Sequence, residues 1–493
     1  MSVPVTEGGL RRKMASGAGW SFIDNLSQQV LSLIIFVILG RLLSPAVFGI
    51  VSTATVIVLL MRSAILNSIT PALVAFPHPE DVDYDTAFWI CVGVGSCAFV
   101  ILLIAAGPLS SFFHIGELAS VIRAMGAIVL LAALAYTHAA WAQRNFMFRE
   151  VAMRNTISTA VAGLVGISVA LAGYGLLALV LNQVVQLIVA VCLLWRAVPW
   201  HPRFRFSKTT ATALMKVALP LGLNQSLWFI AQNFDTAFVT WFLGPLVGGL
   251  YAAAKRVVNA VLVAVDQPII SVALPAFAEV VSAPARFAEA VVRFAGTVTA
   301  VGAPLFAGIA LTAPFSMALL FGAKWSGAAP IVVVLAGGAV AVPTLTVLQQ
   351  VALALGRART ILITTVVQIA LALSAIALVA QRDAVSIALC LTLPTLVTFI
   401  AMPLLLARAT LFPLRKYALA VIRPLICTAI MIAVVLVIPD LNHGPLVQLV
   451  SVGLIGAIVY SGATLVIARN TINELLDMSR MLLKRRGNTK ATS

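Results

Sequence analysis

Two long apolar runs meet at the turn Leu43-Ser-Pro-Ala-Val-Phe-Gly-Ile-Val51, and a similar turn returns as Leu243-Gly-Pro-Leu-Val-Gly-Gly-Leu-Tyr251. Leu, Pro, Val and Gly coincide between the two stretches at an offset of 200 residues. A second pair, Thr70-Pro-Ala-Leu73 and Leu274-Pro-Ala-Phe277, follows in the same order at nearly the same offset. A repeat of this length in an apolar chain favours two similar helical bundles with a site between them. Chance is the alternative interpretation, because Leu, Val, Ala and Gly are common throughout the chain.

The composition indicates an all-α integral membrane protein. Hydrophobic residues make up 61% of the 493 residues, charged residues make up 10%, and the mean hydropathy is +1.08. Soluble domains are about half apolar and roughly a quarter charged. The five cysteines lie inside apolar runs without metal-ligand spacing, and we interpret them as small core residues. The net charge of +16 could suggest a nucleic-acid partner, but the placement of the basic residues argues against one.

The apolar runs predict fourteen membrane-spanning helices, each of about 20 residues or more. The expected spans are 18–40, 46–74, 86–110, 118–141, 154–173, 175–197, 216–243, 246–277, 288–313, 330–355, 359–380, 384–407, 416–438 and 446–468. The first run is too long for a signal-peptide core and has no small-residue cleavage site, so we expect it to be retained as a span.

The basic residues predict the orientation of these spans. With a cytoplasmic N-terminus, nearly all Lys and Arg residues between the spans fall on the cytoplasmic side, and only Arg41, Lys324 and Arg382 fall outside. This distribution follows the positive-inside rule and predicts that both termini are cytoplasmic. The loop 77–85 is an exception, because it carries four acidic residues and no base on the predicted cytoplasmic side.

Ionisable residues inside the spans are the main functional candidates, because a charge in the bilayer is costly. The cations are Arg62, Arg123, Lys255 and Arg256, and the acids are Asp24, Asp235 and Asp266. The sequence has no pattern typical of an enzyme, a nucleotide-binding loop or a metal site. We therefore expect neither catalytic residues nor a resident metal or cofactor.

We expect the four cations to line a cavity that holds an anionic group such as a pyrophosphate, which Arg can bind through its bidentate fork. The alternatives are internal ion pairs, such as Asp235 with Lys255 or Arg256, and snorkelling of the cations to the interface. Polar residues on the first and seventh spans favour a wet interior and are further cavity-lining candidates: Asp24, Asn25 and Gln28, and Asn224, Gln225 and Asp235. The positions that match Lys255 and Arg256 in the first copy are Thr55 and Val56, so we expect the outer part of the anion site on the second bundle.

Several motifs resemble those of a known transporter family. Gly19-Trp20 with Gln28-Gln29, followed by Leu39-Gly-Arg-Leu-Leu-Ser-Pro-Ala-Val-Phe-Gly49, resembles the first helical hairpin of bacterial polysaccharide exporters. These exporters are the Wzx-type lipid-linked oligosaccharide flippases of the MOP superfamily (multidrug, oligosaccharidyl-lipid, polysaccharide). Further similar motifs are Asp85-Thr-Ala-Phe-Trp89, Gln143-Arg-Asn-Phe-Met-Phe-Arg149, Phe234-Asp-Thr236 and Leu250-Tyr251. The resemblance extends over essentially the whole chain, and its diffuse motifs indicate the family better than the substrate.

The resemblance implies a MOP/MATE-like fold in which two pseudo-symmetric six-helix lobes face a V-shaped cavity. The implied parts are a cytoplasmic N-terminus (1–17), an N-lobe (18–197), a cytoplasmic linker (198–215), a C-lobe (216–407), two added helices (408–468) and a basic tail (469–493). The tail is expected either to lie on the anionic inner leaflet as an amphipathic helix or to be solvated.

The function implied by the resemblance is translocation of an undecaprenyl-pyrophosphate-linked oligosaccharide across the bacterial inner membrane by alternating access, for exopolysaccharide, lipopolysaccharide or capsule synthesis. The implied partners are the lipid-linked oligosaccharide, membrane lipids and a polysaccharide polymerase or co-polymerase, with no nucleic acid. Coupling to H+ or Na+ would use Asp24, Asp235 or Asp266. A cation-coupled multidrug antiporter is the main alternative, although it favours twelve helices and an acidic cavity. A membrane polymerase or ligase of lipid-linked glycans is a further alternative, although such an enzyme is expected to carry a large outer loop.

Overall fold

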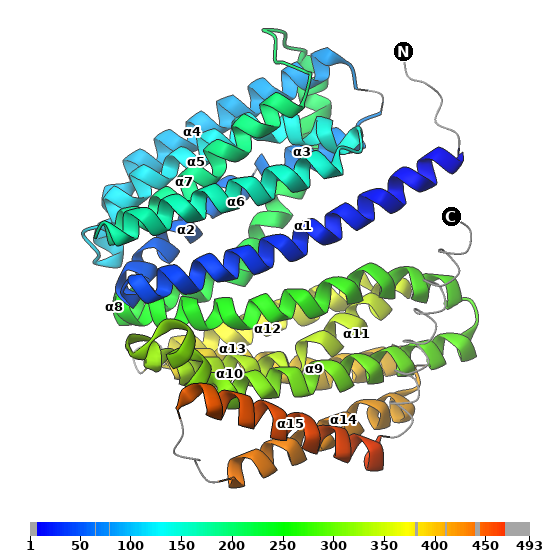
Figure 1. Cartoon of the computed structure of the whole chain (residues 1–493). Coiled ribbons are helices and arrows are strands. Elements are labelled where there is room, and N and C mark those ends of the chain that lie inside the picture. The colour runs from blue at the N-terminus through cyan, green and yellow to red at the C-terminus, as the bar shows by residue number, and fades with distance from the viewer. Residues whose placement is uncertain are drawn as a thin grey trace, which may run out of the picture. The chain divides into compact units, whose positions relative to one another are not determined.

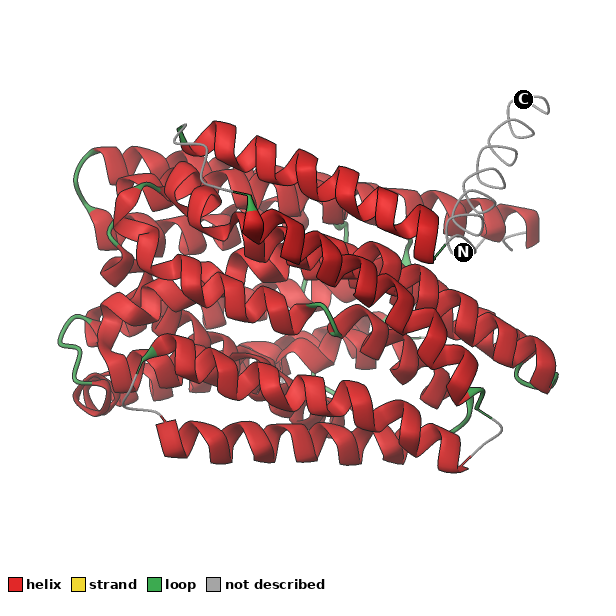
Figure 2. Cartoon of the chain, turned by 90° about the horizontal axis from the view of Figure 1, so that it is seen from below, coloured by secondary structure: helices red, strands yellow, loops and turns green. Residues whose placement is uncertain are grey.

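The computed structural model describes residues 7–64, 66–77, 79–379, 383–409, 412–438 and 444–468 (Figure 1). Every regular element among them is a helix (Figure 2), as expected where backbone polar groups must pair without water. The elements are α1 (Glu7–Leu42), α2 (Pro45–Ala64), α3 (Leu66–Ala75), α4 (Asp81–Phe113), α5 (Leu118–Arg144), α6 (Phe148–Leu171), α7 (Gly175–Ala197), α8 (Lys208–Val280), α9 (Pro284–Phe321), the 3-10 helix η1 (Ala323–Ala328), α10 (Ala329–Ala339), α11 (Val342–Ala354), α12 (Ala358–Val379), α13 (Ala384–Ala409), α14 (Leu414–Val437) and α15 (Pro445–Ile467). The predicted basic tail and the outer residue Arg382 lie outside the described residues.

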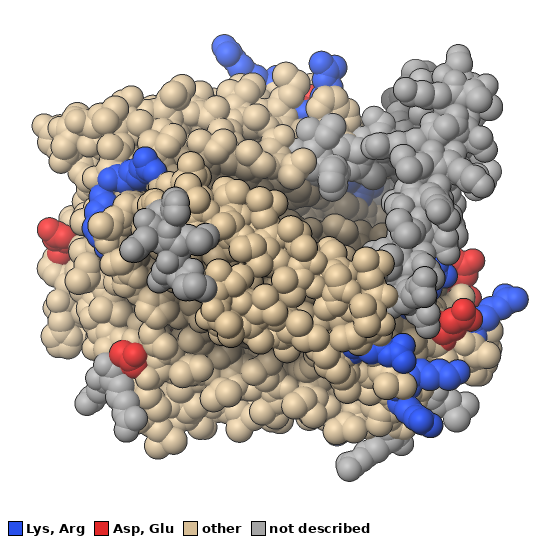
Figure 3. Space-filling model, turned by 60° about the horizontal axis from the view of Figure 1, so that its bottom comes forward, with Lys and Arg blue, Asp and Glu red and all other residues tan. Residues whose placement is uncertain are grey.

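The described part of the chain contains 13 helical segments long and apolar enough to cross a membrane. Charged side chains occupy only small parts of the face in Figure 3, and large apolar side chains are exposed elsewhere, Leu378 to 84% and Ile104 to 72%. These features confirm an all-α, multi-pass membrane protein, since lipid is the environment in which such surfaces are stable. The prediction for the cysteines was wrong in part, because Cys97 and Cys192 are exposed and only the other three are buried.

Helix α8 is a hairpin rather than one straight helix. A straight helix of 73 residues would be about 110 Å long, several times the thickness of a bilayer core. Its backbone is non-helical at Gly244, where φ is +82° and ψ is 172°, a region that only glycine adopts readily. The predicted turn at Gly244-Pro245 is therefore confirmed. The count of fourteen spans requires each half of α8 to cross the membrane, and it stays a prediction.

The span predicted at 330–355 is divided into two helices, α10 and α11. Helices α2 and α3 both fall at the span predicted at 46–74, on either side of residue 65, which lies outside the described residues. Pro343, the second residue of α11, cannot donate a backbone hydrogen bond to the preceding turn. Helix α8 begins at Lys208, before the predicted start of the seventh span at residue 216, and the bounds of the predicted cytoplasmic linker stay a prediction.

The chain divides into two compact units, Met1–Ala252 and Ala253–Ser493, with the division inside α8. In the first unit, α4 packs against α5 and α6 packs against α7, while α1 lies on α6 and both α2 and α3 lie on α5 (Figure 1). Association of these helices depends on close packing and interhelical hydrogen bonds, because lipid tails are as apolar as the side chains. The predicted lobe boundaries at the linker stay a prediction.

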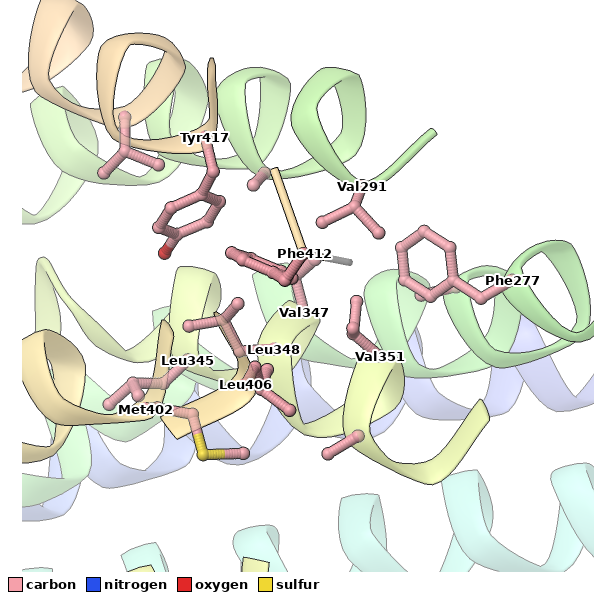
Figure 4. Close-up of a cluster of buried hydrophobic side chains, with 14 of the residues drawn as sticks. Phe277, Val291, Leu345, Val347, Leu348, Val351, Met402, Leu406, Phe412 and Tyr417 are labelled. Atoms are coloured by element: carbon pink, nitrogen blue, oxygen red, sulfur yellow. The ribbon is translucent and has the colours of Figure 1, made fainter. Parts of the chain in front are cut away.

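In the second unit, α9 packs against α10, α11, α14 and α15, and α12 packs against α13. Its core joins the last part of α8 to α9, α11, α13 and α14 through buried apolar side chains (Figure 4). The rings of Phe412 and Tyr417 lie 5.3 Å apart within this cluster. At the α9–α14 contact, a Cβ added to Gly296 would lie 3.3 Å from the Cβ of Ala420, so small residues set this spacing.

Replacing Gly244 by alanine is predicted to destabilise the protein by about 1–3 kcal/mol, because a Cβ is strained in this backbone region. The measurement is the unfolding free energy of the purified protein in detergent. Gly93→Ala is the matched control, since Gly93 lies inside α4 and a Cβ added there meets no atom within 4 Å. Equal stability of the two variants would show that the turn does not need a positive φ.

Candidate substrate site

The two copies of the repeated turn contact each other in the first unit. A Cβ added to Gly49 would overlap the carbonyl oxygen of Pro245, and a Cβ added to Gly249 would overlap the carbonyl oxygen of Pro45. The same added atoms would lie 2.9 Å and 3.0 Å from the backbone nitrogen of the opposite glycine. The contact is therefore reciprocal, with each glycine placed against the proline that begins the other helix segment. Only glycine lets two backbones approach this closely.

Two motifs of the α8 hairpin are joined by a buried hydrogen bond. The Tyr251 hydroxyl donates to Oδ2 of Asp235 over 2.7 Å, and the backbone N–H of Thr236 donates to Oδ1 over 2.8 Å. In a straight helix, residues 16 positions apart would be separated by about 24 Å, so this bond requires the reversal at Gly244. Asp235 therefore has a structural role in the hairpin, and its pairing with Lys255 or Arg256 stays a prediction.

The polar face of α1 is bonded to α6. Asn155 donates from Nδ2 to Oδ2 of Asp24 over 2.8 Å, and the Thr159 hydroxyl donates to Oε1 of Gln28 over 2.7 Å. Gln186 of α7 donates in turn to the Thr159 hydroxyl oxygen over 3.0 Å. These bonds join three helices, so Asp24 and Gln28 serve at least to fix helix packing. Asn25 is exposed, and its predicted lining role stays a prediction.

Arg154 is a charged neighbour of this network that the sequence reasoning missed. Its guanidinium donates to Oδ1 of Asn155 over 2.6 Å and 3.1 Å, and Asn155 is bonded to Asp24 on its other side. The hydropathy pattern placed Arg154 at the edge of a span, whereas α6 begins earlier, at Phe148. An interhelical bond between Asp24 and Asn155 therefore has a base adjacent to it.

Buried polar atoms without a hydrogen-bond partner among the described residues occur at four of the predicted positions. They are Oδ1 of Asp24, Nε2 of Gln28, Nε of Arg62 and Oδ1 of Asp266. Asp266 of α8 accepts one long hydrogen bond, 3.3 Å from the Thr346 hydroxyl of α11. Buried polar atoms are rarely left unpaired, so the two carboxylate oxygens are the best candidates to bind a small cation or a proton. Within the described ranges, no group of three or more His, Cys, Asp or Glu residues could hold a metal ion.

The predicted cations occupy different environments. Arg62 is half-buried near the end of α2, and its Nε is buried without a hydrogen-bond partner in the described part of the chain. It lies close enough to Tyr136 of α5 for its charge to act on the phenol, whose hydroxyl donates to Oδ1 of Asn67. The sequence reasoning missed Tyr136 and Asn67, because a phenol and an amide in apolar runs gave no distinct signal.

Two of the other cations are more exposed than Arg62. They are Arg123, near the start of α5, and Arg256, in the second part of α8, whereas Lys255 beside Arg256 is half-buried like Arg62. Asn224 is exposed and Gln225 is half-buried in the first part of α8. The prediction that these residues and Arg62 line one cavity stays a prediction.

Comparison with known proteins identifies relatives over most of the chain. The family model described as "Polysaccharide biosynthesis protein" matches residues 38–330. The succinoglycan biosynthesis transport protein ExoT of Rhizobium meliloti is 24% identical over 475 residues, which cover 95% of this chain and 96% of ExoT. The lipopolysaccharide biosynthesis protein WzxC of Escherichia coli is 22% identical and covers 65% of this chain and 66% of WzxC.

Solved structures show a similar fold. The lipid II flippase MurJ in an inward closed conformation superposes with a TM-score of 0.71 at 12% identity, covering 92% of this chain and 99% of MurJ. An inward-facing MATE multidrug resistance transporter of the MOP superfamily superposes with a TM-score of 0.54 at 15% identity, covering 80% of this chain and 99% of that one. The predicted MOP/MATE-like fold is therefore confirmed.

Tyr251→Phe is predicted to lower the unfolding free energy by about 0.6–1.7 kcal/mol, the range of interhelical hydrogen bonds in membranes. The loss arises because Oδ2 of Asp235 would lose its donor inside the hairpin. Chemical unfolding in mixed detergent measures the change. Tyr174→Phe is the control, because Tyr174 is 64% exposed between α6 and α7. An unchanged free energy in Tyr251→Phe would mean that the bond does not stabilise the hairpin.

Proposed function

We infer the function from one premise: the chain belongs to the polysaccharide biosynthesis protein family, whose model matches residues 38–330. We propose that it is a flippase that translocates undecaprenyl-pyrophosphate-linked oligosaccharide units across the bacterial inner membrane, for exopolysaccharide, lipopolysaccharide or capsule synthesis. The whole-length similarity to a succinoglycan biosynthesis transport protein supports transport rather than catalysis. Both termini would be cytoplasmic, and a polysaccharide polymerase would use the translocated product.

The environment of Arg62 is the main reason for proposing an anionic substrate. A half-buried guanidinium inside a membrane-spanning segment is costly unless it has a partner. Its buried Nε has none among the described residues, and a lipid-linked pyrophosphate would supply one. Lys255, Arg256 and Arg123 would extend the positive path along which the headgroup moves.

The contact between the repeated turns is the proposed outer gate. Alternating access requires a contact that closes one side of the path and can separate without breaking strong bonds. The Gly49–Pro245 and Gly249–Pro45 approaches are close contacts between backbones, with no side chain of either glycine between them. Separating such a contact costs little free energy, because no side chains interlock. The closed contact is specific, because any side chain at either glycine would prevent it.

Asp266 is the proposed coupling carboxylate for H+ or Na+. Asp235 already accepts hydrogen bonds from Tyr251 and Thr236, and Asp24 is bonded to Asn155 beside Arg154. Asp24 and Asp266 each have a buried oxygen without a partner among the described residues. Their other oxygens differ, because that of Asp24 accepts a bond of 2.8 Å, whereas that of Asp266 accepts only one long bond of 3.3 Å. Asp266 is therefore the acid with most to gain from a cation or a proton.

A cation-coupled multidrug antiporter is the second candidate, favoured by the similarity of fold to a MATE transporter. A polymerase or ligase of lipid-linked glycans is less favoured, because the relatives described above include a named transport protein. Inverted membrane vesicles with labelled lipid-linked glycan separate the candidates. A flippase moves the glycan into the lumen unchanged, an antiporter leaves it outside, and a polymerase lengthens it.

Arg62→Ala is predicted to abolish polymer export, with Arg256→Ala having the same direction of effect, because each removes a positive charge from the substrate path. Polymer secreted per cell and membrane levels of each variant are the measurements. Arg415→Gln is the control, as this exposed base begins α14. Wild-type export by both Arg62→Ala and Arg256→Ala would contradict a cationic path for the substrate.

Gly249→Ala is predicted to hold the outer gate open, since the added methyl group would overlap the Pro45 carbonyl. In a cysteine-free background, a membrane-impermeant maleimide added outside should label Gln225→Cys severalfold faster in the Gly249→Ala protein, and transport should slow. Gly93→Ala should leave the labelling rate unchanged. Equal labelling in both backgrounds would rule out the paired turns as the gate.

A further inference from the structure

The linker between α7 and α8 is held against α4 at several points. Trp200 is buried, with its ring 5.8 Å from Tyr84 and 5.0 Å from His138. The backbone N–H of Arg203 donates to Oδ1 of Asp85 over 3.0 Å, and Nε1 of Trp89 donates to the Arg203 carbonyl over 2.9 Å. The backbone of this linker is thus fixed, although it contains no helix or strand.

Two of the acidic residues in the predicted loop 77–85 explain this attachment, and the structure places both in the first turns of α4, which begins at Asp81. Asp83 and Asp85 are buried, with exposed fractions of 9% and 0%. Asp83 accepts from the Thr210 hydroxyl over 2.6 Å and from the backbone N–H of Glu80 over 2.9 Å. Asp85 therefore accepts from a backbone N–H group, and Asp83 accepts from a backbone N–H group and a hydroxyl. These bonds do not involve the exposed basic side chains of the linker.

The exposed surface of the linker carries aromatic and basic side chains in alternation. Phe204 is 92% exposed and Phe206 is 57% exposed. Arg203, Arg205 and Lys208 are exposed between and beside them. One face of the Phe204 ring stacks on Trp89, with centroids 4.6 Å apart and planes at 21°. This stacking presents the remainder of the Phe204 ring outward instead of folding it into the protein.

The position of the linker places this surface at the membrane boundary. The two helices that it joins, α7 and α8, are both long and apolar enough to span the membrane, and only ten residues separate Ala197 from Lys208. Exposed phenylalanines of membrane-surface segments are buried at the boundary between lipid headgroups and acyl chains, and basic side chains there are attracted to anionic lipid. The predicted cytoplasmic side is also the side where polybasic segments meet negative surface charge.

We propose that residues 203–208 form an interfacial anchor that binds anionic membrane lipid, with the two phenylalanines at the boundary between headgroups and acyl chains and the three cations against the phosphates. The positive charge of residues 203–208 matches the anionic phosphates, and their exposed rings match the apolar part of the lipid. An acidic protein surface would satisfy the cations, but it would leave no reason for two exposed phenylalanines at the membrane boundary. This inference does not depend on the transported substrate.

The test is the melting temperature of the purified full-length protein in detergent, titrated with phosphatidylglycerol or with phosphatidylcholine. Phosphatidylglycerol should raise the melting temperature of the wild type more than phosphatidylcholine does. Arg203→Gln/Arg205→Gln should lose at least half of that difference, and Phe204→Ser/Phe206→Ser should also reduce it. Melting temperatures without added lipid establish that each variant is folded.

Arg415→Gln/Lys416→Gln is the matched control, because it removes the same charge at two exposed bases whose aromatic neighbours Phe412 and Tyr417 are buried. It should keep the wild-type lipid response. A wild-type response in the Arg203→Gln/Arg205→Gln protein would overturn the proposal. The same response together with lost polymer export would assign the surface to an acidic protein partner instead.

Discussion

The backbone contact between Gly49 and Gly249 is the constraint on which the first unit depends. Two helix segments that each begin with proline can approach this closely only where both lack a side chain. The second segment reaches that position because α8 reverses at Gly244, where a positive φ is required. The bond from Tyr251 to Asp235 then joins the two halves of the reversal. The two copies of the repeat recognised in the sequence thus contact each other. The glycine of each copy lies against the proline of the other copy.

Polar atoms in the described part of this membrane protein fall into two groups with different consequences. Some form hydrogen bonds between helices or within the hairpin, as at Asp24 Oδ2, Gln28 Oε1 and Asp235, and such bonds stabilise a membrane bundle by modest amounts each. Others are buried without hydrogen-bond partners among the described residues, as at Arg62 Nε, Asp266 Oδ1, Asp24 Oδ1 and Gln28 Nε2. An unpaired polar atom in a low-dielectric interior raises the free energy of the folded state, so a ligand that pairs with it binds more tightly. Function is therefore better sought at the second group than at polarity in general.

The helices were predictable from the sequence because backbone groups in lipid must pair internally, and long apolar runs leave helix as the simplest solution. The break that separates α10 from α11 was not predicted as an interruption, since packing around it decides whether a helix continues. Cys97 and Cys192 were assigned to the core because hydropathy does not distinguish lipid from protein interior. For the same reason, the sequence located Asp24 inside a span without identifying Asn155 as its partner. The family motifs were enough to locate the turns, whereas the partners of individual side chains could be identified only from the folded structure.

The attachment of the linker limits where the first part of α8 can move. Asp83 and Asp85 bind groups at Thr210 and Arg203, so α8 is held to α4 at its first turn. Any separation of Gly249 from Pro45 must then arise further along the helix. Pro220 lies 10 residues beyond Thr210, and a proline inside a helix removes a backbone hydrogen bond and weakens the helix against bending. The structure thus combines a fixed start, a proline-weakened middle and a glycine-dependent end in one helix, which is the arrangement that a hinged gate requires.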